Sequence, residues 1–586
     1  MKRRWVVGCG LWVVGGFLLA AQAPQESEDV ILRAMREEMA RSRSLRLMPL
    51  APAYFMEYAL HDAENLSAAA TLGALIQARR TRFRLPRVQT RIGDYNSDNT
   101  NFVGAEFYSG TRWEVEPFPL DDSYAVLRHH LWLATDIAYK TAVEGMGRKR
   151  AILRSVAPGE QMADFSRAEP LVRLEQARAE RVDLDAWSAR LRRLSAVFAS
   201  YPEVYQSAVE FDASRGAFYL ANTEGAEVRV AEGMLLVRVR ATAQAPDGMP
   251  LRDATVFHAL APAGMASEAE MERGALQAAE NLTALVRAPL GEAYTGPVLF
   301  EGIAGAQILA EVLGKQFAIP RRPLSPPGRP VPVLTSELEG RLGVRILPEW
   351  MDVVDDPTQK EWRGRPLFGH YRVDLEGVVP EPVVLVDKGV LKNFLLTRQP
   401  VRGFGASNGR ARLPGGFGAK VATFGNLFVR AGQTMRSAEL RQRLIELCRQ
   451  RNKPYGILIR KMDFPSSASL EDLRRLLAGT ASSGARIISP PILAYRVYPD
   501  GREELVRGLR FRNLNTRAFR DILAASDETH VFDFLDTAAP MAVAAGASFL
   551  AECSVIAPSF LVDDLELERP QEEMTRPPLV PPPPLK

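Results

Sequence analysis

Histidine and cysteine, the side chains that most often bind zinc, are scarce in this sequence. Its 586 residues include six histidines and three cysteines. Three cysteines are too few for a disulfide scaffold, and no two histidines have short ligand spacing apart from the adjacent pair His129 and His130. Neighbouring residues of a helix point about 100° apart, so this pair cannot bind one metal ion. The composition therefore gives no sign of a histidine-based metal site.

A strong net charge is also missing. Lys and Arg number 74 against 70 Asp and Glu, a formal charge of +4. If Lys2, Arg3 and Arg4 are removed with the leader described below, 71 basic residues face 70 acidic ones, which leaves +1. A chain this close to neutral has no overall field that would attract DNA or RNA. We therefore expect no nucleic-acid partner.

The first 23 residues have the three-part pattern of a secretory signal peptide. Basic residues 2–4 precede an apolar run over residues 5–20, and Ala21-Gln22-Ala23 forms a small-residue cleavage site before Pro24. The run is shorter than the roughly 20 residues that span a bilayer. We expect cleavage, an exported mature chain that is periplasmic or secreted, and no stable membrane span afterwards. An uncleaved membrane anchor is the alternative.

Periodicity predicts the local elements that follow. Apolar residues at helical spacing predict helices over residues 28–42, from Asp121 to Leu153, over 170–200 and over 268–287. Between residues 205 and 256 the period changes to two, which predicts four or so antiparallel strands. Residues 571–586 are rich in proline and are expected to be a disordered tail.

Residues 91–102, RIGDYNSDNTNF, concentrate acidic and amide side chains from Asp94 to Asn101. Such residues are typical of a polar loop. Their oxygens would also suit a hard cation, although the spacing is not that of an EF-hand. Both interpretations of the loop stay open.

Residues 296–317, GPVLFEGIAGAQILAEVLGKQF, predict a strand that runs directly into an apolar helix. Ile308, Leu309, Val312 and Leu313 recur at helical spacing and define one buried face. Glu301 stands where the strand ends. The dipole of the helix N-terminus would stabilise its carboxylate.

This segment resembles the strand-to-helix junction that carries the HExxxH zinc motif in the TldD/PmbA family of metallopeptidases, also called the modulator-of-gyrase family. Setting Val298 and Leu299 on the family's apolar pair puts Phe300 at the first histidine, Glu301 at the glutamate and Gly305 at the second histidine. Only the glutamate is kept. Glu301 is thus the candidate catalytic residue, a remnant of the motif, and no zinc ligand or other cofactor is predicted.

Other segments resemble the family in the same order along the chain, from about residue 28 to about residue 570. They are GDY…DN within residues 93–99, NTEG at 222–225, DLEG at 374–377, DKG at 387–389, SNGRAR at 407–412, GNLFV at 425–429 and PPILAYRVYPDGREELVRGLRF at 490–511. Their shared order makes the resemblance strong, and the missing histidines make this chain similar to the motif-lacking PmbA/TldE-type subunit.

The resemblance implies an α+β fold in two parts. Residues 24–290 would form a helix-plus-antiparallel-sheet domain and residues 291–570 a β-rich domain. In the family, an HExxxH-bearing subunit assembles with a motif-lacking homologue around a chamber for unfolded peptides. The resemblance therefore implies a non-catalytic subunit of an exported heteromeric peptidase, whose partners are a TldD-like homologue and unfolded peptides.

Two alternatives remain, so whether the chain is itself an enzyme stays open. The first alternative is an active metallopeptidase with unusual ligands such as Glu301, Cys553 and a distant histidine. The second is a peptide-binding scaffold without proteolysis. The family's third ligand is a cysteine near the C-terminus. Cys553 lies only five residues before Pro558-Ser559, which is closer than the family pattern leads us to expect, so we do not assign it that role. Cys448 and Cys553 could form one disulfide, although Cys448 lies in an apolar helix pattern that favours a buried thiol.

Overall fold

The structure is a computed structural model of the chain. It describes residues 29–44, 52–104, 111–113, 118–155, 162–176, 181–326, 328, 335–415, 418–464, 488–537, 550–571, 574 and 583. The expected signal peptide and almost all of the expected proline-rich tail lie outside these residues.

The N-terminal half is built on a seven-stranded sheet with the strand order β3-β2-β1-β5-β6-β4, in which β7 also pairs with β6. Neighbouring strands are antiparallel except for β4 and β6. The strands are β1 (Ala53–Thr71), β2 (Ala74–Ile92), β3 (Thr111–Trp113), β4 (Val172–Leu174), β5 (Val204–Asn222), β6 (Glu227–Gln244) and β7 (Pro250–Ala259).

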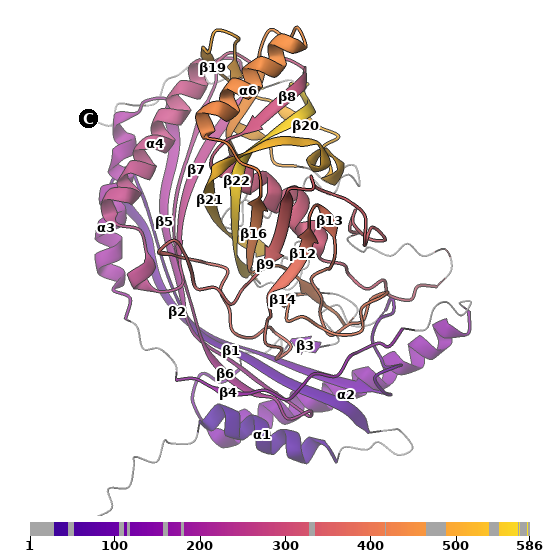
Figure 1. Cartoon of the computed structure of the whole chain (residues 1–586). Coiled ribbons are helices and arrows are strands. Elements are labelled where there is room, and N and C mark those ends of the chain that lie inside the picture. Colours follow the sequence, from indigo (N-terminus) through magenta and orange to yellow (C-terminus); the bar gives the residue numbers. More distant parts are fainter. Residues whose placement is uncertain are drawn as a thin grey trace, which may run out of the picture.

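Three long strands thus replace the four or so expected between residues 205 and 256. The glycines that suggested extra turns lie inside strands. Gly216 sits in β5 opposite Ala63, where a Cβ atom would come within 2.0 Å of the Asp62 carbonyl oxygen. Only glycine fits so close an approach of two backbones, and the long strands curve as they cross the molecule (Figure 1).

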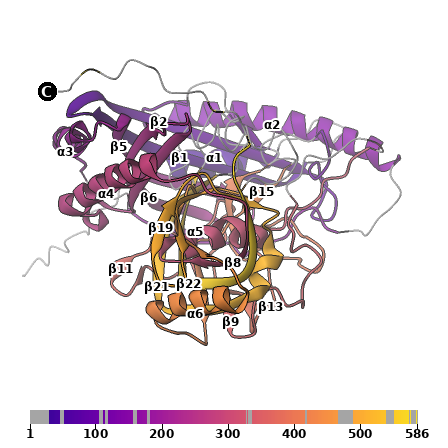
Figure 2. The ribbon, with the colours of Figure 1, turned by 90° about the horizontal axis from the view of Figure 1, so that it is seen from above.

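Four helices cover the outer, convex side of this sheet in two pairs (Figures 1 and 2). They are α1 (Val30–Ser42), α2 (Tyr124–Leu153), α3 (Leu184–Ala196) and α4 (Glu268–Arg287). The first pair packs on a core that includes Tyr58 and Leu60, and the second on one that includes Leu66 and Val237. The helix expected over residues 170–200 begins only at Leu184, because Asp183 caps its first turn and residues 172–174 belong to β4.

The C-terminal half contains an eleven-stranded mixed sheet that lies in the concave side of the first (Figure 1). Its main path is β13-β12-β9-β16-β22-β8-β17-β18-β19, and β20 and β21 pair with β22. The strands are β8 (Tyr294–Phe300), β9 (Met351–Asp355), β12 (Val383–Asp387), β13 (Val390–Leu391), β16 (Asn426–Ala431), β17 (Gly456–Met462), β18 (Pro491–Val497), β19 (Glu503–Val506), β20 (Arg510–Arg512), β21 (Ile522–Thr537) and β22 (Leu550–Glu568).

Short elements complete this half. Two small hairpins pair β10 (Glu361–Trp362) with β11 (Arg365–Pro366) and β14 (Ala411–Pro414) with β15 (Lys420–Ala422). Helix α5 (Ile303–Ile308) lies on one face of β8, where it packs with Val298 and Phe300. Helix α6 (Ser437–Gln450) lies on the other face, against Leu299. Short 3-10 helices in the described residues include η1 (Val197–Ser200), η2 (Pro262–Gly264) and η5 (Thr516–Asp521).

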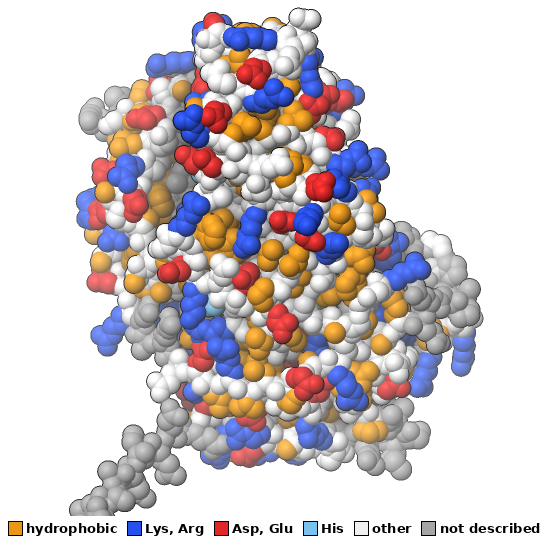
Figure 3. All heavy atoms as spheres, in the orientation of Figure 1, with side chains coloured by type: hydrophobic (Ala, Val, Ile, Leu, Met, Phe, Trp, Pro, Cys, Tyr) orange, Lys and Arg blue, Asp and Glu red, His pale blue; other side chains and the backbone are white. Residues whose placement is uncertain are grey.

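The α+β fold class predicted from the sequence is confirmed, whereas the predicted domain boundaries stay a prediction. On the face shown in Figure 3, Lys and Arg side chains alternate with Asp and Glu, and no broad area carries one sign of charge. Within the described ranges, no helix is both long enough and apolar enough to cross a membrane.

Candidate functional site

The junction between β8 and α5 has the strand-to-helix form that the sequence predicted. Glu301 and Gly302 make the turn, and Gly302 adopts a φ of 65°, which favours glycine. Its N–H donates to Ser559 Oγ of β22 at 2.8 Å. After α5 the chain continues as a π-helical turn, η3 (Leu309–Leu313), and a 3-10 turn, η4 (Gly314–Phe317).

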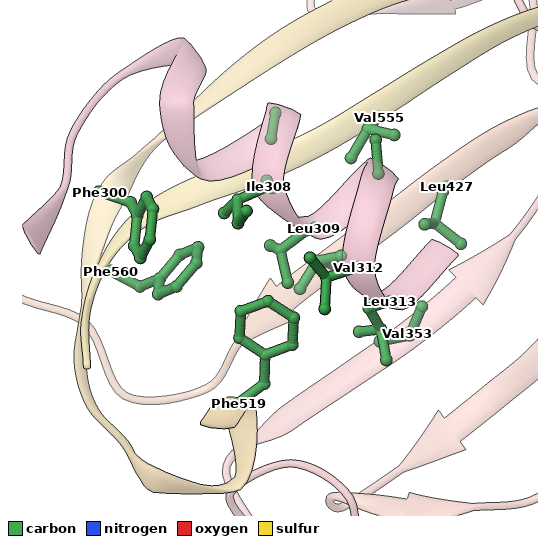
Figure 4. Close-up of a cluster of buried hydrophobic side chains, with 14 of the residues drawn as sticks. Phe300, Ile308, Leu309, Val312, Leu313, Val353, Leu427, Phe519, Val555 and Phe560 are labelled. Atoms are coloured by element: carbon green, nitrogen blue, oxygen red, sulfur yellow. The ribbon is translucent and has the colours of Figure 1, made fainter. Parts of the chain in front are cut away.

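The apolar face predicted for this helix is confirmed as core. Ile308, Leu309, Val312 and Leu313 are all at most 1% exposed. Figure 4 shows them pointing at side chains from β9, β16, β22 and η5, among them Val353, Leu427, Val555 and Phe519. This face is therefore used within the chain and is closed to any partner.

Phe300, at the position of the family's first histidine, is completely buried. Its ring centroid lies 5.2 Å from that of Phe560 on β22 (Figure 4). It also lies 6.0 Å from the ring centroid of Phe511 on β20. Aromatic rings at such separations stabilise a core beyond the area that they bury. An aromatic cluster thus occupies the place where a metal ligand would stand.

Gly305, at the position of the second histidine, lies against the backbone of β22. A Cβ atom added to it would lie 2.7 Å from the carbonyl oxygen of Pro558 and 3.5 Å from the ring of Phe560. Since a backbone carbonyl cannot rotate away as a side chain can, no larger residue fits here unless α5 and β22 move apart. Helix α5 and strand β22 are therefore in direct backbone contact at this point.

Glu301 keeps its carboxylate, but two arginines hold it. Arg441 of α6 donates from Nε and Nη2 at 2.6 and 2.9 Å, and Arg460 of β17 donates from Nε at 2.8 Å. Arg460 also pairs with Glu503 at 2.8 Å. Burial opposes the charged form of Glu301, but the hydrogen bonds from both arginines outweigh it and lower the pKa of this carboxyl group.

A general base works best with a pKa near the operating pH, so this environment is the reverse of what a catalytic glutamate needs. The carboxylate bonds to guanidinium groups rather than standing alone at the start of α5. The sequence did not identify Arg441 or Arg460 as its partners, because both lie about 150 residues further along the chain.

Cys553 lies far from Glu301 along the same sheet. Phe300 pairs with Phe560 on the antiparallel β22, which puts Glu301 level with Ser559, six residues from Cys553, or roughly 20 Å along the strand at about 3.3 Å per residue. Its Sγ donates to the Phe424 carbonyl at 3.2 Å, and burial raises the pKa of the thiol. Cys448 is also a free, buried thiol, as its helix pattern favoured.

The described histidines do not supply the metal ligands that the β8–α5 junction lacks. His61 pairs with Glu232 across the N-terminal sheet, His370 contacts the Pro357 carbonyl, and His129 and His130 lie side by side on α2. Among the residues that the structure describes, no three His, Cys, Asp or Glu side chains form a group that could hold a metal ion. The donor groups at the junction, one arginine-bound carboxylate beside a phenyl ring and a glycine, do not fit zinc.

The loop from Asp94 to Asn101 is polar, but its inner part is buried. Asp98 and Thr100 are 0% exposed. Asp98 pairs with Arg91 at 2.6 Å, and Arg91 reaches the Gly418 carbonyl of the C-terminal half at 3.1 Å. The cation that neutralises Asp98 is therefore the guanidinium group of Arg91, not a metal ion. In this structure the loop joins the two halves of the molecule.

Comparison with known proteins gives sequence matches over parts of the chain and a fold match over 91% of it. Residues 294–462 match the family model of the PmbA/TldA metallopeptidase C-terminal domain. A metalloprotease of Archaeoglobus fulgidus is 40% identical over 78 residues, which is 13% of this chain and 17% of that protein. A metalloprotease of Methanocaldococcus jannaschii is 31% identical over 100 residues, or 17% of this chain and 20% of that protein. The matches thus span about a fifth of these relatives or less.

Two solved structures share the fold across nearly the whole chain. A protein of Thermotoga maritima, described as a modulator of DNA gyrase, has a TM-score of 0.56 at 14% identity, and the match covers 91% of this chain and 99% of that one. TldE of Thermococcus kodakarensis has a TM-score of 0.54 at 13% identity, with the same coverage. The family model over residues 294–462 and the metalloprotease relatives agree with the order of motifs in the sequence and support a member of the TldD/PmbA family, and the two structures share its fold.

Proposed function

We propose that this chain is a non-catalytic subunit of an exported heteromeric peptidase that acts on unfolded peptides. Its partner would be a homologue that carries an intact HExxxH motif. The observation that carries the proposal is the β8–α5 junction, where Phe300 and Gly305 are packed into the core and Glu301 is bound by two arginines.

The chemistry of zinc peptidases explains why this junction matters. Such an enzyme needs three protein ligands, an open fourth position for water and a carboxylate that takes a proton from that water. Phenylalanine and glycine have no donor atom in their side chains. A carboxylate that accepts hydrogen bonds from two guanidinium groups has a lowered pKa and is a weak proton acceptor. The chain's own residues therefore support a structural role here.

The rest of the scaffold supports a role through its surfaces. Phe300 and Gly305, at the positions of the two histidines, are closely packed against β22, and Glu301 is held by two arginines, so the strand and the helix form a tightly packed scaffold. A subunit of this kind is useful if a competent partner supplies the chemistry. A permanent interface between two such chains should bury more than about 2,000 Å².

A reconstitution experiment tests the division of labour. The mature chain is mixed with an HExxxH-bearing homologue from the same cell, and peptidase activity is measured on an unfolded polypeptide. We expect a stable complex with activity that neither chain has alone. Glu301→Gln in this chain should leave that activity nearly intact, and the same change in the partner's motif should abolish it.

Glu503→Gln is the matched control, because it changes a carboxylate in the same arginine cluster but outside the motif position. If Glu301→Gln abolishes activity while Glu503→Gln does not, this chain takes part in the chemistry and the proposal is wrong. If no HExxxH-bearing homologue binds the chain, the scaffold interpretation replaces it.

Export is the second part of the proposal and rests on residues 1–23. We expect the mature chain to begin at or near Pro24. N-terminal sequencing of the protein recovered from the periplasm or the medium measures this directly. A retained Met1 in the membrane fraction would contradict it.

A further inference from the structure

The N-terminal sheet ends at strand β4, and the outer edge of this strand is open. β4 is the last strand of the main path of the sheet and runs parallel to β6. Leu171 and Glu175, at its two ends, form backbone hydrogen bonds with β6 at 2.8 and 2.7 Å. Successive residues of a strand turn their backbone groups to opposite sides, so Val172 and Leu174 direct theirs away from β6. Among the described residues, no hydrogen bond reaches these outward groups.

The side chains on this edge are apolar and exposed. Val172 is 68% exposed and Leu174 is 49% exposed. Proteins commonly protect an open edge with lysine, proline or a bulge. β4 pairs with β6 without a bulge, and residues 172–176 include no lysine and no proline. An unprotected edge of this kind is a place where another strand adds to the sheet.

The geometry of the strand separates its apolar and charged side chains. Val172 and Leu174 stand beside Glu227 and Arg229 of β6, which form ion pairs with α1 and its N-cap residue. The two apolar side chains therefore lie on the helix-bearing face of the sheet. Arg173, between them, points to the opposite face.

The charges of β4 decide which strand fits. Arg173 contacts Glu175 at 2.9 Å, and Glu175 also pairs with Arg372 of the C-terminal half. These groups are thus neutralised within the chain, and they attract no charged partner by themselves. They do determine which residues of an added strand can stand opposite them, because like charges directly opposite each other destabilise a strand pair.

A second copy of the chain can pair with β4 in antiparallel registers that are centred on residue 172, 173 or 174. The register centred on 172 puts Glu169 opposite Glu175. It also places Pro170, which has no N–H group, in the ladder opposite Leu174. The register centred on 173 puts Arg173 opposite its own copy. Both are unfavourable.

The register centred on residue 174 avoids these conflicts. Arg173 of each copy then stands opposite Glu175 of the other, and Leu174 stands opposite Leu174. Pro170 lies outside the paired residues 172–176. The alternation of apolar and charged residues in β4 is therefore complementary to itself, which points to a second copy of this chain as the partner.

We propose that two copies of this chain associate through β4 in the register centred on Leu174, so that their N-terminal sheets become one continuous sheet. Two hydrogen bonds join the Leu174 backbones, and the two side chains pack on the helix-bearing face. The paired residues 172–176 span roughly 17 Å at about 3.3 Å per residue. An interface this short is weak and forms in a concentration-dependent way. It is independent of the HExxxH-bearing partner, because both strands belong to this chain.

Disulfide trapping tests the register. Residues that exchange two hydrogen bonds across an antiparallel pair have Cα atoms about 5.5 Å apart, which suits a disulfide. The two residues at position 174 meet this condition. The two residues at position 172 are displaced by four residues, or roughly 13 Å along the strands, and cannot be bridged. Cys448 and Cys553 are buried and leave the background low.

Three variants of the mature chain are oxidised under mild conditions and separated on a non-reducing gel. We expect Leu174→Cys to form a disulfide-linked dimer and Val172→Cys to stay monomeric. Leu342→Cys is the matched control, because Leu342 is also 49% exposed but lies in a loop of the C-terminal half. It should stay monomeric as well.

Sedimentation velocity tests the association without a crosslink. The wild-type mature chain should pass from monomer to dimer as its concentration rises. Leu174→Lys should raise the dissociation constant by about tenfold or more, since two ammonium groups would meet where two leucines packed. Leu342→Lys should leave it unchanged. Both side chains are half exposed, so unchanged melting temperatures would show that each variant is folded.

The opposite results would overturn the proposal. A wild-type chain that stays monomeric at every concentration would show that the edge of β4 binds no second copy. Trapping through Val172→Cys instead of Leu174→Cys would exclude the register. Equal trapping in all three cysteine variants would reflect random collision, and an unchanged dissociation constant in Leu174→Lys would place the interface elsewhere.

Discussion

Replacement of Gly305 by alanine should destabilise the protein, although alanine is normally the better residue in a helix. Gly305 lies within α5, so the substitution gains about 1 kcal/mol from helix propensity. The added Cβ, however, would lie 2.7 Å from the Pro558 carbonyl oxygen, closer than carbon and oxygen normally approach. To relieve this contact, α5 must move away from β22, which is a paired inner strand of the eleven-stranded sheet.

The two effects can be compared in magnitude. Extra atoms forced into a close-packed core cost about 1–3 kcal/mol. Most of this range lies above the gain of about 1 kcal/mol from helix propensity. The difference is a net loss of up to about 2 kcal/mol in the free energy of unfolding. Urea denaturation of the wild-type and variant chains, followed by tryptophan fluorescence, measures the difference.

Gly147→Ala is the matched control. Gly147 lies within α2, and no atom stands within 4 Å of the Cβ that would be added. This variant should gain about 0.5–1 kcal/mol, since only the propensity term changes. If Gly305→Ala stabilises the chain as much as Gly147→Ala does, then α5 and β22 are not in tight contact. Space for a second histidine would then exist at this position, and close packing could not be what excludes it.

Three further predictions concern buried charge and metal. Asp98→Asn should cost about 3–5 kcal/mol in urea denaturation, because it leaves a buried guanidinium without its counter-ion, whereas Asp94→Asn, on the exposed side of the same loop, should cost little. Burial and the nearby Glu376 raise the pKa of Asp374 to about 7. The folded chain therefore holds a proton that the unfolded chain releases near pH 4, so the unfolding free energy should fall as the pH rises from 5 to 8. Glu376→Gln should flatten that profile, and a profile equally steep in the variant would contradict this cause. Purified wild-type chain should hold well under one equivalent of zinc by elemental analysis, and stoichiometric zinc would favour an active metallopeptidase.

Periodicity and turn chemistry alone determined much of the local structure. Helix α4 spans residues 268–287, as its apolar spacing predicted, because Ser267 and Glu270 form a capping box at its start. The strand-to-helix junction and the buried face of Ile308 and Leu313 also followed from the sequence, since a helix with one apolar stripe must bury it. The sequence alone also shows that Phe300 and Gly305 stand where the family's motif has its two histidines.

Only the tertiary structure decided what the remaining groups do. The partners of Glu301 lie on α6 and β17, far along the chain, and local sequence says nothing about pairs that are brought together by sheet order. The same holds for Asp98, whose loop looked solvent-facing or cation-binding until Arg91 and the C-terminal half enclosed it. Composition predicts that a segment is polar. Whether its charges meet water, a metal ion or an arginine depends on which distant residues the fold places beside them.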